Sequence, residues 1–163
     1  MIESVQVSLF LAGVLAAVLP VPFVAQQKDT CAAASLTMVL RFWQAPASHD
    51  EIAAALQAAE LRGIAGSRLR DFARERGFQA IAYEGDLQNL REYVEKGRPL
   101  IVAWKMGRRR YHDVVVVGFD AENDAILVND PDAGAARAVP SRTFEKRWAG
   151  AGHWTLLVLP EPR

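Results

Sequence analysis

The hydrophobic pattern of this 163-residue chain changes at Pro99, and that change limits the fold more than any other feature. Before Pro99, apolar residues recur every three or four positions, which is typical of amphipathic helices. After it, short apolar runs separated by turn residues predict strands. A chain with helices in its first half and antiparallel strands in its second belongs to the α+β class, and its length suits one domain.

The helices expected before Pro99 begin after residues whose side chains can accept a backbone hydrogen bond, and they end near glycine or proline. Asp29 and Thr30 precede the first helix, and Ser48 with Glu51 forms a capping box for the second. Ser67 and Asp86 are the caps expected for the third and fourth helices. The elements expected in this half are helices over 31–43, 48–60, 67–77 and 86–97, with a short strand over 79–83.

Two of the strands expected after Pro99 form a hairpin around a turn at residues 122–123. In this hairpin Asp130 falls opposite Val114 or Val115, with one or two residue pairs between it and His112, which is within reach of a side-chain hydrogen bond. The elements expected in this half are strands over 100–104, 112–119, 125–129, 137–139 and 154–159, with a short helix capped by Ser141.

Charge and cysteine content exclude several classes of function. The chain has 19 basic and 19 acidic residues, so it lacks the positive balance of a nucleic-acid-binding protein. Its single cysteine cannot form an internal disulfide or build a cysteine-based zinc cluster. No metal or other cofactor is expected.

The N-terminal segment is apolar, with no charged residue from Ser4 to Gln27. This suits a secretory signal cleaved near Ala16 and Ala17, or an uncleaved anchor continuing to Ala25. A buried N-terminal helix is the alternative, because no Lys or Arg precedes the run. We expect residues 1–20 to be a signal peptide or membrane anchor and residues 21–160 to form the domain. The protein is then exported, with or without attachment to a membrane.

The lone cysteine, Cys31, stands in the first turn of its expected helix. Free backbone N–H groups and the helix dipole there favour a thiolate, which is the nucleophilic form. The alternative is a small apolar residue that simply packs in the core. A catalytic role would require a base for the thiol proton and a group that orients the base.

His112 is the best candidate for that base, because it opens an apolar strand whose hairpin partner ends at Asp130. The carboxylate of Asp130 can hold one imidazole nitrogen and direct the other towards Cys31. Asn129 is the alternative orienting residue, since a slip of one residue in the strand register would exchange the two. The remaining histidines, at positions 49 and 153, are explained by a capping box and by a surface or strand-entry position.

Three segments resemble the motifs of C39 and C39-like cysteine peptidases, which have a papain-like fold. They are residues 21–40 (VPFVAQQKDTCAAASLTMVL), 111–120 (YHDVVVVGFD) and 128–134 (VNDPDAG), in the order that the family has them. Phe144 and Trp148 fit the segment that usually follows. The resemblance covers the chain from about Val21 to Leu159 and implies N-terminal helices packed on a C-terminal antiparallel sheet.

The resemblance implies a role for each matching residue. Cys31 is the nucleophile, His112 the general base and then acid, and Asp130 the residue that orients the histidine. A glutamine shortly before the cysteine supplies the oxyanion-hole side chain in this family, and Gln26 matches best, with Gln27 beside it as the alternative. The backbone N–H of Cys31 would be the second donor.

The chain departs from the family pattern directly after the cysteine. The family usually has Gly there, often followed by Pro, whereas this chain has Ala32 and Ala33, and a side chain at this point can narrow the substrate groove. The best-known members trim double-glycine leader peptides and are fused to transporters. The sequence holds no P-loop motif or set of long apolar spans, so a stand-alone domain is expected and leader trimming is not carried over.

The expected function is therefore hydrolysis of peptide or protein substrates through an acyl-enzyme on Cys31. One alternative is a non-catalytic domain that binds peptides in the same groove, and another is a thiol-dependent acyltransferase or amidase. The basic run at residues 108–110 lies just before His112. It is either a rim that favours acidic substrates or simply a solvated loop.

Overall fold

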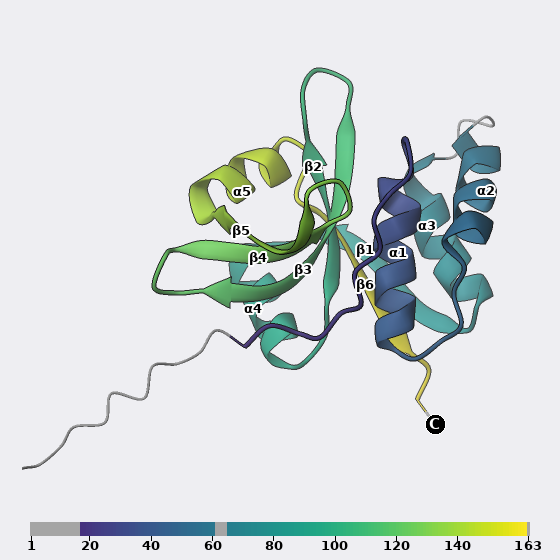
Figure 1. The fold of residues 1–163 in the computed structure, drawn as a ribbon, viewed down its shortest axis with the longest axis horizontal. Coiled ribbons are helices and arrows are strands. Elements are labelled where there is room, and N and C mark those ends of the chain that lie inside the picture. Colours follow the sequence, from purple (N-terminus) through teal and green to yellow (C-terminus); the bar gives the residue numbers. More distant parts are fainter. Residues whose placement is uncertain (1–16, 61–64, 163) are drawn as a thin grey trace, which may run out of the picture.

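The computed structural model describes residues 17–60 and 65–162. In this part of the chain six strands form one antiparallel sheet in the order β1-β6-β2-β3-β4-β5 (Figure 1). The elements are α1 (Cys31–Phe42), α2 (His49–Glu60), α3 (Ala65–Glu75), β1 (Phe78–Glu84), α4 (Leu87–Glu95), β2 (Leu100–Lys105), β3 (Tyr111–Asp120), β4 (Ala125–Asp130), β5 (Gly134–Pro140), α5 (Ser141–Ala149) and β6 (Trp154–Pro160).

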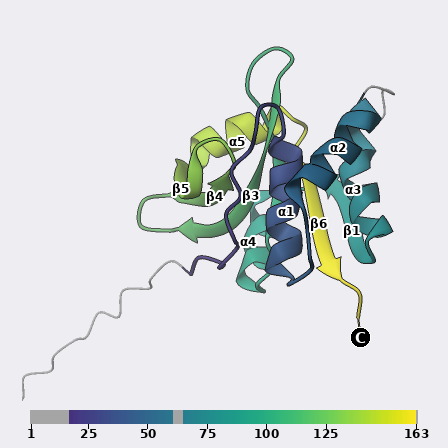
Figure 2. The ribbon, with the colours of Figure 1, turned by 45° about the vertical axis from the view of Figure 1, so that its right-hand side comes forward.

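The sheet separates two hydrophobic clusters. Helices α1, α2 and α3 pack on one face, whereas α4 and α5 lie on the other (Figures 1 and 2). Side chains alternate along β3, so Val115 and Val117 belong to the first cluster while Val114 and Val116 belong to the second. Each such buried side chain contributes roughly 1.5–3 kcal/mol, so both layers hold β3 firmly in the centre of the molecule.

Helix α1 is the most deeply buried helix among the described elements, because every residue from Ala33 to Leu40 is buried. Its C-terminal end is tied to the sheet where the indole Nε1–H of Trp43 donates to the carbonyl of Val158 at 2.9 Å. Thr30 occupies the N-cap position, as predicted, but its hydroxyl makes no capping bond. It donates instead to the carbonyl of Gln27.

The α+β class is confirmed, and the differences from the expected elements lie at their ends. Helix α3 begins two residues before Ser67, and β5 is longer than residues 137–139. Pro140, not Ser141, occupies the N-cap of α5, which has no side-chain cap. The cap predicted for α4 is present, because the carboxylate of Asp86 accepts the backbone N–H of Asn89 at 2.8 Å.

An extended segment over residues 17–30 precedes α1 and runs across the sheet (Figure 1). The N–H of Leu19 donates to the carbonyl of Val117 at 2.8 Å, and the Leu19 side chain packs against both hydrophobic clusters. A Cβ at Gly118 would lie 3.1 Å from the carbonyl oxygen of Ala17, so glycine permits this close approach.

The predicted signal peptide or anchor over residues 1–20 lies, apart from its last four residues, outside the described residues. In the part of the chain that the structure describes, no helix has the length and apolar character needed to cross a membrane.

Candidate active site

The first turn of α1, the start of β3 and the end of β4 meet at one end of the molecule (Figures 1 and 2). This brings Cys31, His112 and Asp130 to one cleft. The relative position of α1 and β3 is fixed one helical turn beyond Cys31, where the buried hydroxyl of Ser35 donates to the carbonyl of Asp113 at 3.1 Å. The sequence analysis did not predict this contact of Ser35. A serine in a helix rich in Ala and Leu can, however, indicate that its hydroxyl makes a specific hydrogen bond.

The histidine and the aspartate are in direct contact. His112 Nε2 lies 2.7 Å from Asp130 Oδ1, and their side chains are only 12% and 13% exposed. Oδ1 also accepts the backbone N–H groups of Asp132 at 2.9 Å and Ala133 at 3.3 Å. A carboxylate can only accept, so Nε2 carries a proton. This leaves Nδ1 as the ring nitrogen available to Cys31, which lines the same cleft.

These contacts change the acidity of both partners. Burial alone lowers the pKa of His112, but hydrogen bonds to Asp130 and Cys31, together with their negative charges, raise it to about 10. Burial raises the pKa of Asp130, but the hydrogen bond from His112, the backbone N–H groups and the charge of His112 outweigh it and lower that pKa. At neutral pH the pair is therefore an imidazolium and a carboxylate.

A β-bulge in the β3–β4 hairpin explains why Asp130, and not Asn129, faces His112. The register shifts between Val116 and Gly118, so that Asn129 pairs with Val115 and the next residue falls beside Val114. The Asn129 amide is buried and bonded to backbone on both sides, donating to the carbonyl of Val21 and accepting from Ala136 N–H.

The two adjacent glutamines point to different places. Gln26 lines the cleft with Cys31, and its Nε2 lies 3.5 Å from Asp132 Oδ1. Its backbone N–H donates to the carbonyl of Pro131 at 2.9 Å, and its Oε1 is buried without a hydrogen-bond partner among the described residues. Gln27 turns away from the cleft. The structure thus places Gln26, and not Gln27, beside the candidate nucleophile.

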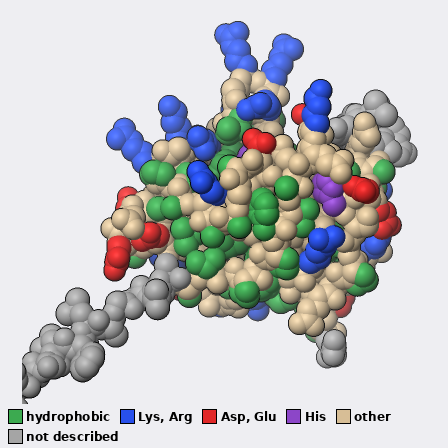
Figure 3. Space-filling model, in the orientation of Figure 1, with side chains coloured by type: hydrophobic (Ala, Val, Ile, Leu, Met, Phe, Trp, Pro, Cys, Tyr) green, Lys and Arg blue, Asp and Glu red, His purple; other side chains and the backbone are tan. Residues whose placement is uncertain are grey.

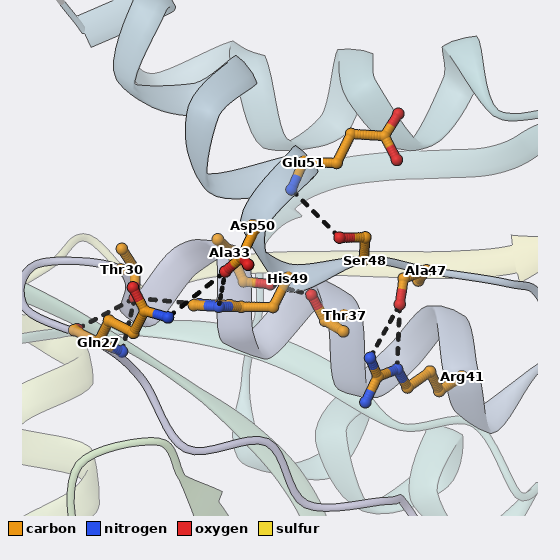
Figure 4. A network of polar contacts seen from close by, with 10 residues as sticks. All are labelled: Gln27, Thr30, Ala33, Thr37, Arg41, Ala47, Ser48, His49, Asp50 and Glu51. Carbon is orange, nitrogen blue, oxygen red and sulfur yellow. Dashed lines mark hydrogen bonds and ion pairs between the residues drawn. The ribbon is translucent and has the colours of Figure 1, made fainter.

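The segment before Cys31 is fastened to α2 by a polar network (Figure 4). The Gln27 amide donates to Asp50 at 3.4 Å, and Thr30 Oγ1 accepts the backbone N–H of Gln27 at 2.9 Å. His49 Nε2 lies 3.0 Å from Thr30 Oγ1. His49 therefore has a structural partner next to the nucleophile, in addition to its place at the start of α2.

The cleft has a volume of about 670 Å³. Ala32 lines it, whereas the Ala33 side chain is buried in the core, so only one of the two alanines can narrow the groove. The lining residues are Gln26, Asp29, Cys31, Ala32, Leu56, Arg68, Leu69, Ala103, Met106, Arg109, Arg110, Tyr111, His112, Asp113, Asp130, Asp132, Ala151 and Trp154.

Other polar features lie apart from this cleft. A second hollow of about 580 Å³, between the end of α1 and the start of α2, contains neither Cys31 nor His112. His153 pairs with Glu145 at 2.7 Å and stacks edge-on against Trp148. Among the described residues, no group of three or more His, Cys, Asp or Glu side chains is placed to hold a metal ion.

Comparison with known proteins matches this chain to one protein family. The sequence profile of the Peptidase_C39 like family matches residues 18–155, which is most of the chain. A search of curated protein sequences gives no significant match.

Several solved structures have the same papain-like fold. One is a double glycine motif protease from an AMS/PCAT transporter in complex with the leader peptide. It is 24% identical, with a TM-score of 0.70, and the match covers 88% of this chain and 94% of that one. Another is the peptidase domain of Streptococcus ComA, a bifunctional ABC transporter involved in quorum sensing. It is 23% identical, with a TM-score of 0.69 and coverages of 86% and 99%.

Proposed function

The chain belongs to the Peptidase_C39 like family, and from that membership we propose that it is a cysteine peptidase acting through Cys31, His112 and Asp130. One observation carries the proposal. The imidazole of His112 is hydrogen-bonded to Asp130 through Nε2, and it lines one cleft with Cys31, whose interaction with the ring raises the pKa of His112. This is the arrangement that a nucleophile, a base and an orienting group require.

The reaction begins with attack by the Cys31 sulfur on the carbonyl carbon of a peptide bond. His112 holds the thiol proton as an imidazolium, a state that Asp130 favours by accepting Nε2–H. When the tetrahedral intermediate collapses, His112 gives its Nδ1 proton to the leaving amine, and an acyl-enzyme remains. Asp130 keeps the ring oriented throughout, because the backbone of its own turn holds its carboxylate.

The negative charge on the intermediate requires hydrogen-bond donors beside the sulfur. We assign this role to the Gln26 amide, which lines the cleft, and to the backbone N–H of Cys31 at the start of α1. Such preorganised donors are worth about 3 kcal/mol of barrier each. A water molecule then attacks the acyl-enzyme, with neutral His112 as its base, and releases the acid product.

The substrate we propose is a peptide or an exposed segment of a protein. One relative of the same fold was solved with a leader peptide bound. The open cleft beside Cys31 is lined by apolar side chains such as Leu69 and Met106 together with polar ones, which suits an extended chain.

The test is chemical labelling of Cys31 combined with peptide cleavage. Iodoacetamide should alkylate the wild-type protein quickly even at pH 6, and His112→Ala should label slowly at that pH, because a thiolate needs the imidazolium beside it. Cys31→Ala should lose all cleavage of short, internally quenched peptide libraries while its melting temperature stays almost unchanged.

Other results would point elsewhere. Slow labelling at pH 6 that His112→Ala leaves unaltered would mean an inert thiol and would favour a peptide-binding domain without catalysis. Fast labelling without hydrolysis, but with product formed when an amine acceptor is added, would identify an acyltransferase. A large fall in melting temperature in Cys31→Ala would indicate a core cysteine.

A further inference from the structure

We propose that Arg109 and Arg110 bind acidic side chains of the substrate, so that the cleft selects acidic peptides. The two arginines stand in the loop between β2 and β3 and line the cleft that holds Cys31. This inference rests on the peptidase function proposed above and adds the class of substrate. Arg108, in the same loop, is exposed but does not line the cleft.

The loop has a defined shape that presents these side chains. The β2–β3 ladder continues to the pair Lys105 and Tyr111, and the backbone N–H of Met106 donates to the carbonyl of Arg110 at 2.8 Å. Gly107 has a φ of +137°, a conformation that side chains rarely allow, so the glycine sets the turn. The arginines are thus attached to a closed hairpin end and not to a loose segment.

The side chains of the arginines in this loop have no partner among the described residues, in contrast to most of the other arginines that the structure describes. Arg68 is paired with Glu75 and Arg70 with Asp71. Others bind backbone carbonyls or cover aromatic rings. A guanidinium offers paired donors that match a carboxylate, so Arg109 and Arg110 present free sites for one.

The loop also belongs to a basic edge of a molecule whose net charge is zero. Figure 3 shows Lys and Arg side chains projecting from the end of the molecule that carries the β2–β3 loop, whereas acidic side chains gather at the β3–β4 turn. The end of α5 adds Lys146 and Arg147 near this edge, where a Cβ at Gly150 would lie 2.9 Å from Lys105 Cβ. Clustered positive charge attracts acidic ligands towards the cleft.

The aspartates that line the cleft limit where an acidic side chain can bind. Asp130 is neutralised by His112, and Asp132 accepts from Gln26, so these carboxylates lie at the catalytic end. Asp29 stands two residues before the nucleophile, and Asp113 already has an interaction of its own. Acidic substrate residues are therefore expected next to the β2–β3 loop, and not at the positions flanking the scissile bond.

The experiment uses internally quenched peptides with randomised centres, flanked on both sides by Glu, Gln or Lys residues. The wild-type protein should cleave the Glu-flanked set with kcat/KM about 3- to 10-fold above the Gln-flanked set, as expected for exposed ion pairs, and Lys should be the poorest. Arg109→Glu/Arg110→Glu should invert the order and favour Lys, whereas Arg108→Glu should keep the wild-type order.

Binding of the same peptides, labelled with a fluorophore, to Cys31→Ala separates this inference from the proposed function. Preference for Glu in binding without cleavage by the wild type would sustain the inference and refute the peptidase assignment. Cleavage with equal rates for the three flanks would refute the inference and leave the peptidase assignment standing. Equal effects of Arg108→Glu and of the double variant, or no peptide binding at all, would also overturn it.

Discussion

The proton on His112 Nε2 is fixed by Asp130, and the position of Asp130 is fixed by two backbone N–H groups of its own turn. Together with the interaction with Cys31, these hydrogen bonds raise the pKa of His112 far above its usual value. At the scale of single residues, the His112–Asp130 ion pair therefore stabilises the folded protein, in addition to its proposed role in catalysis. The free energy of unfolding consequently depends on the protonation of His112.

We expect the stabilising contribution of His112 to disappear at alkaline pH. Its pKa is about 6.5 in the unfolded chain and about 10 in the fold. The contribution is complete below pH 6.5, declines as the pH rises through that interval and is gone above about pH 10. In urea unfolding at pH 6, 8 and 10, the gap in free energy of unfolding between wild type and His112→Gln should shrink by at least about 1 kcal/mol. A gap that stays constant would show that the pKa is not raised.

Asn129 and Asp130 should respond to substitution in opposite ways. Asp130→Asn should lower kcat by on the order of 10-fold or more, because the imidazolium loses its carboxylate. Asn129→Ala should instead lower the free energy of unfolding by about 1–3 kcal/mol, because the buried Asn129 amide is removed and the Val21 carbonyl and the Ala136 N–H lose their partner. Steady-state kinetics and urea unfolding of both variants measure this, and the reverse pattern would make Asn129 the orienting residue.

At the scale of secondary structure elements, the crossing of α1 over β3 sets the distance between Cys31 and His112. The Ser35 hydroxyl, bonded to the carbonyl of Asp113, is the polar contact at that crossing. Apolar packing allows small sliding motions, whereas a hydrogen bond with one donor and one acceptor defines a single register.

Ser35→Ala should therefore affect activity as well as stability. We expect a loss of about 1 kcal/mol in the free energy of unfolding and a several-fold slower alkylation of Cys31. Thr37→Val is the matched control, because the Thr37 hydroxyl donates at 2.7 Å to Ala33 within the same helix (Figure 4). It should lose similar stability but keep the wild-type labelling rate. Equal labelling rates in the two variants would assign Ser35 a purely structural role.

The elements were largely predictable from the sequence, and the details of the site only in part. Apolar periodicity and capping residues placed the helices and strands to within a few residues, because those signals are local. The choice between Asn129 and Asp130 depended on the bulge before Gly118, at a point where the N-terminal segment and β4 pack closely around the glycine. The choice between Gln26 and Gln27 depended on contacts with Pro131 and Asp50, which are distant in sequence.

At the scale of the whole molecule, the sheet keeps two hydrophobic clusters apart, and the segment before α1 connects them. Leu19 packs against both clusters and makes one backbone hydrogen bond to β3. The same segment, residues 17–30, contains Gln26 and leads directly into Cys31. The segment that contacts both clusters therefore also positions two candidate site residues.

Leu19→Ala should lower the free energy of unfolding by about 1–2 kcal/mol, because a half-buried side chain that contacts both clusters is removed. Val18→Ala is the control, since the Val18 side chain is 44% exposed and its removal should cost almost nothing. Guanidinium unfolding of both variants provides the measurement. Equal free energies of unfolding for the two variants would mean that packing of Leu19 against the two hydrophobic clusters does not stabilise the fold.

Cys31 is the only thiol in the 163 residues. Once oxidised to a sulfenic acid, it has no neighbouring cysteine with which to close a disulfide, so recovery depends on a small thiol from solution. Because there is only one cysteine, titration of the candidate active site with a thiol reagent is simple. One equivalent of a thiol-directed electrophile adds one mass increment, and intact-protein mass spectrometry then counts competent molecules directly.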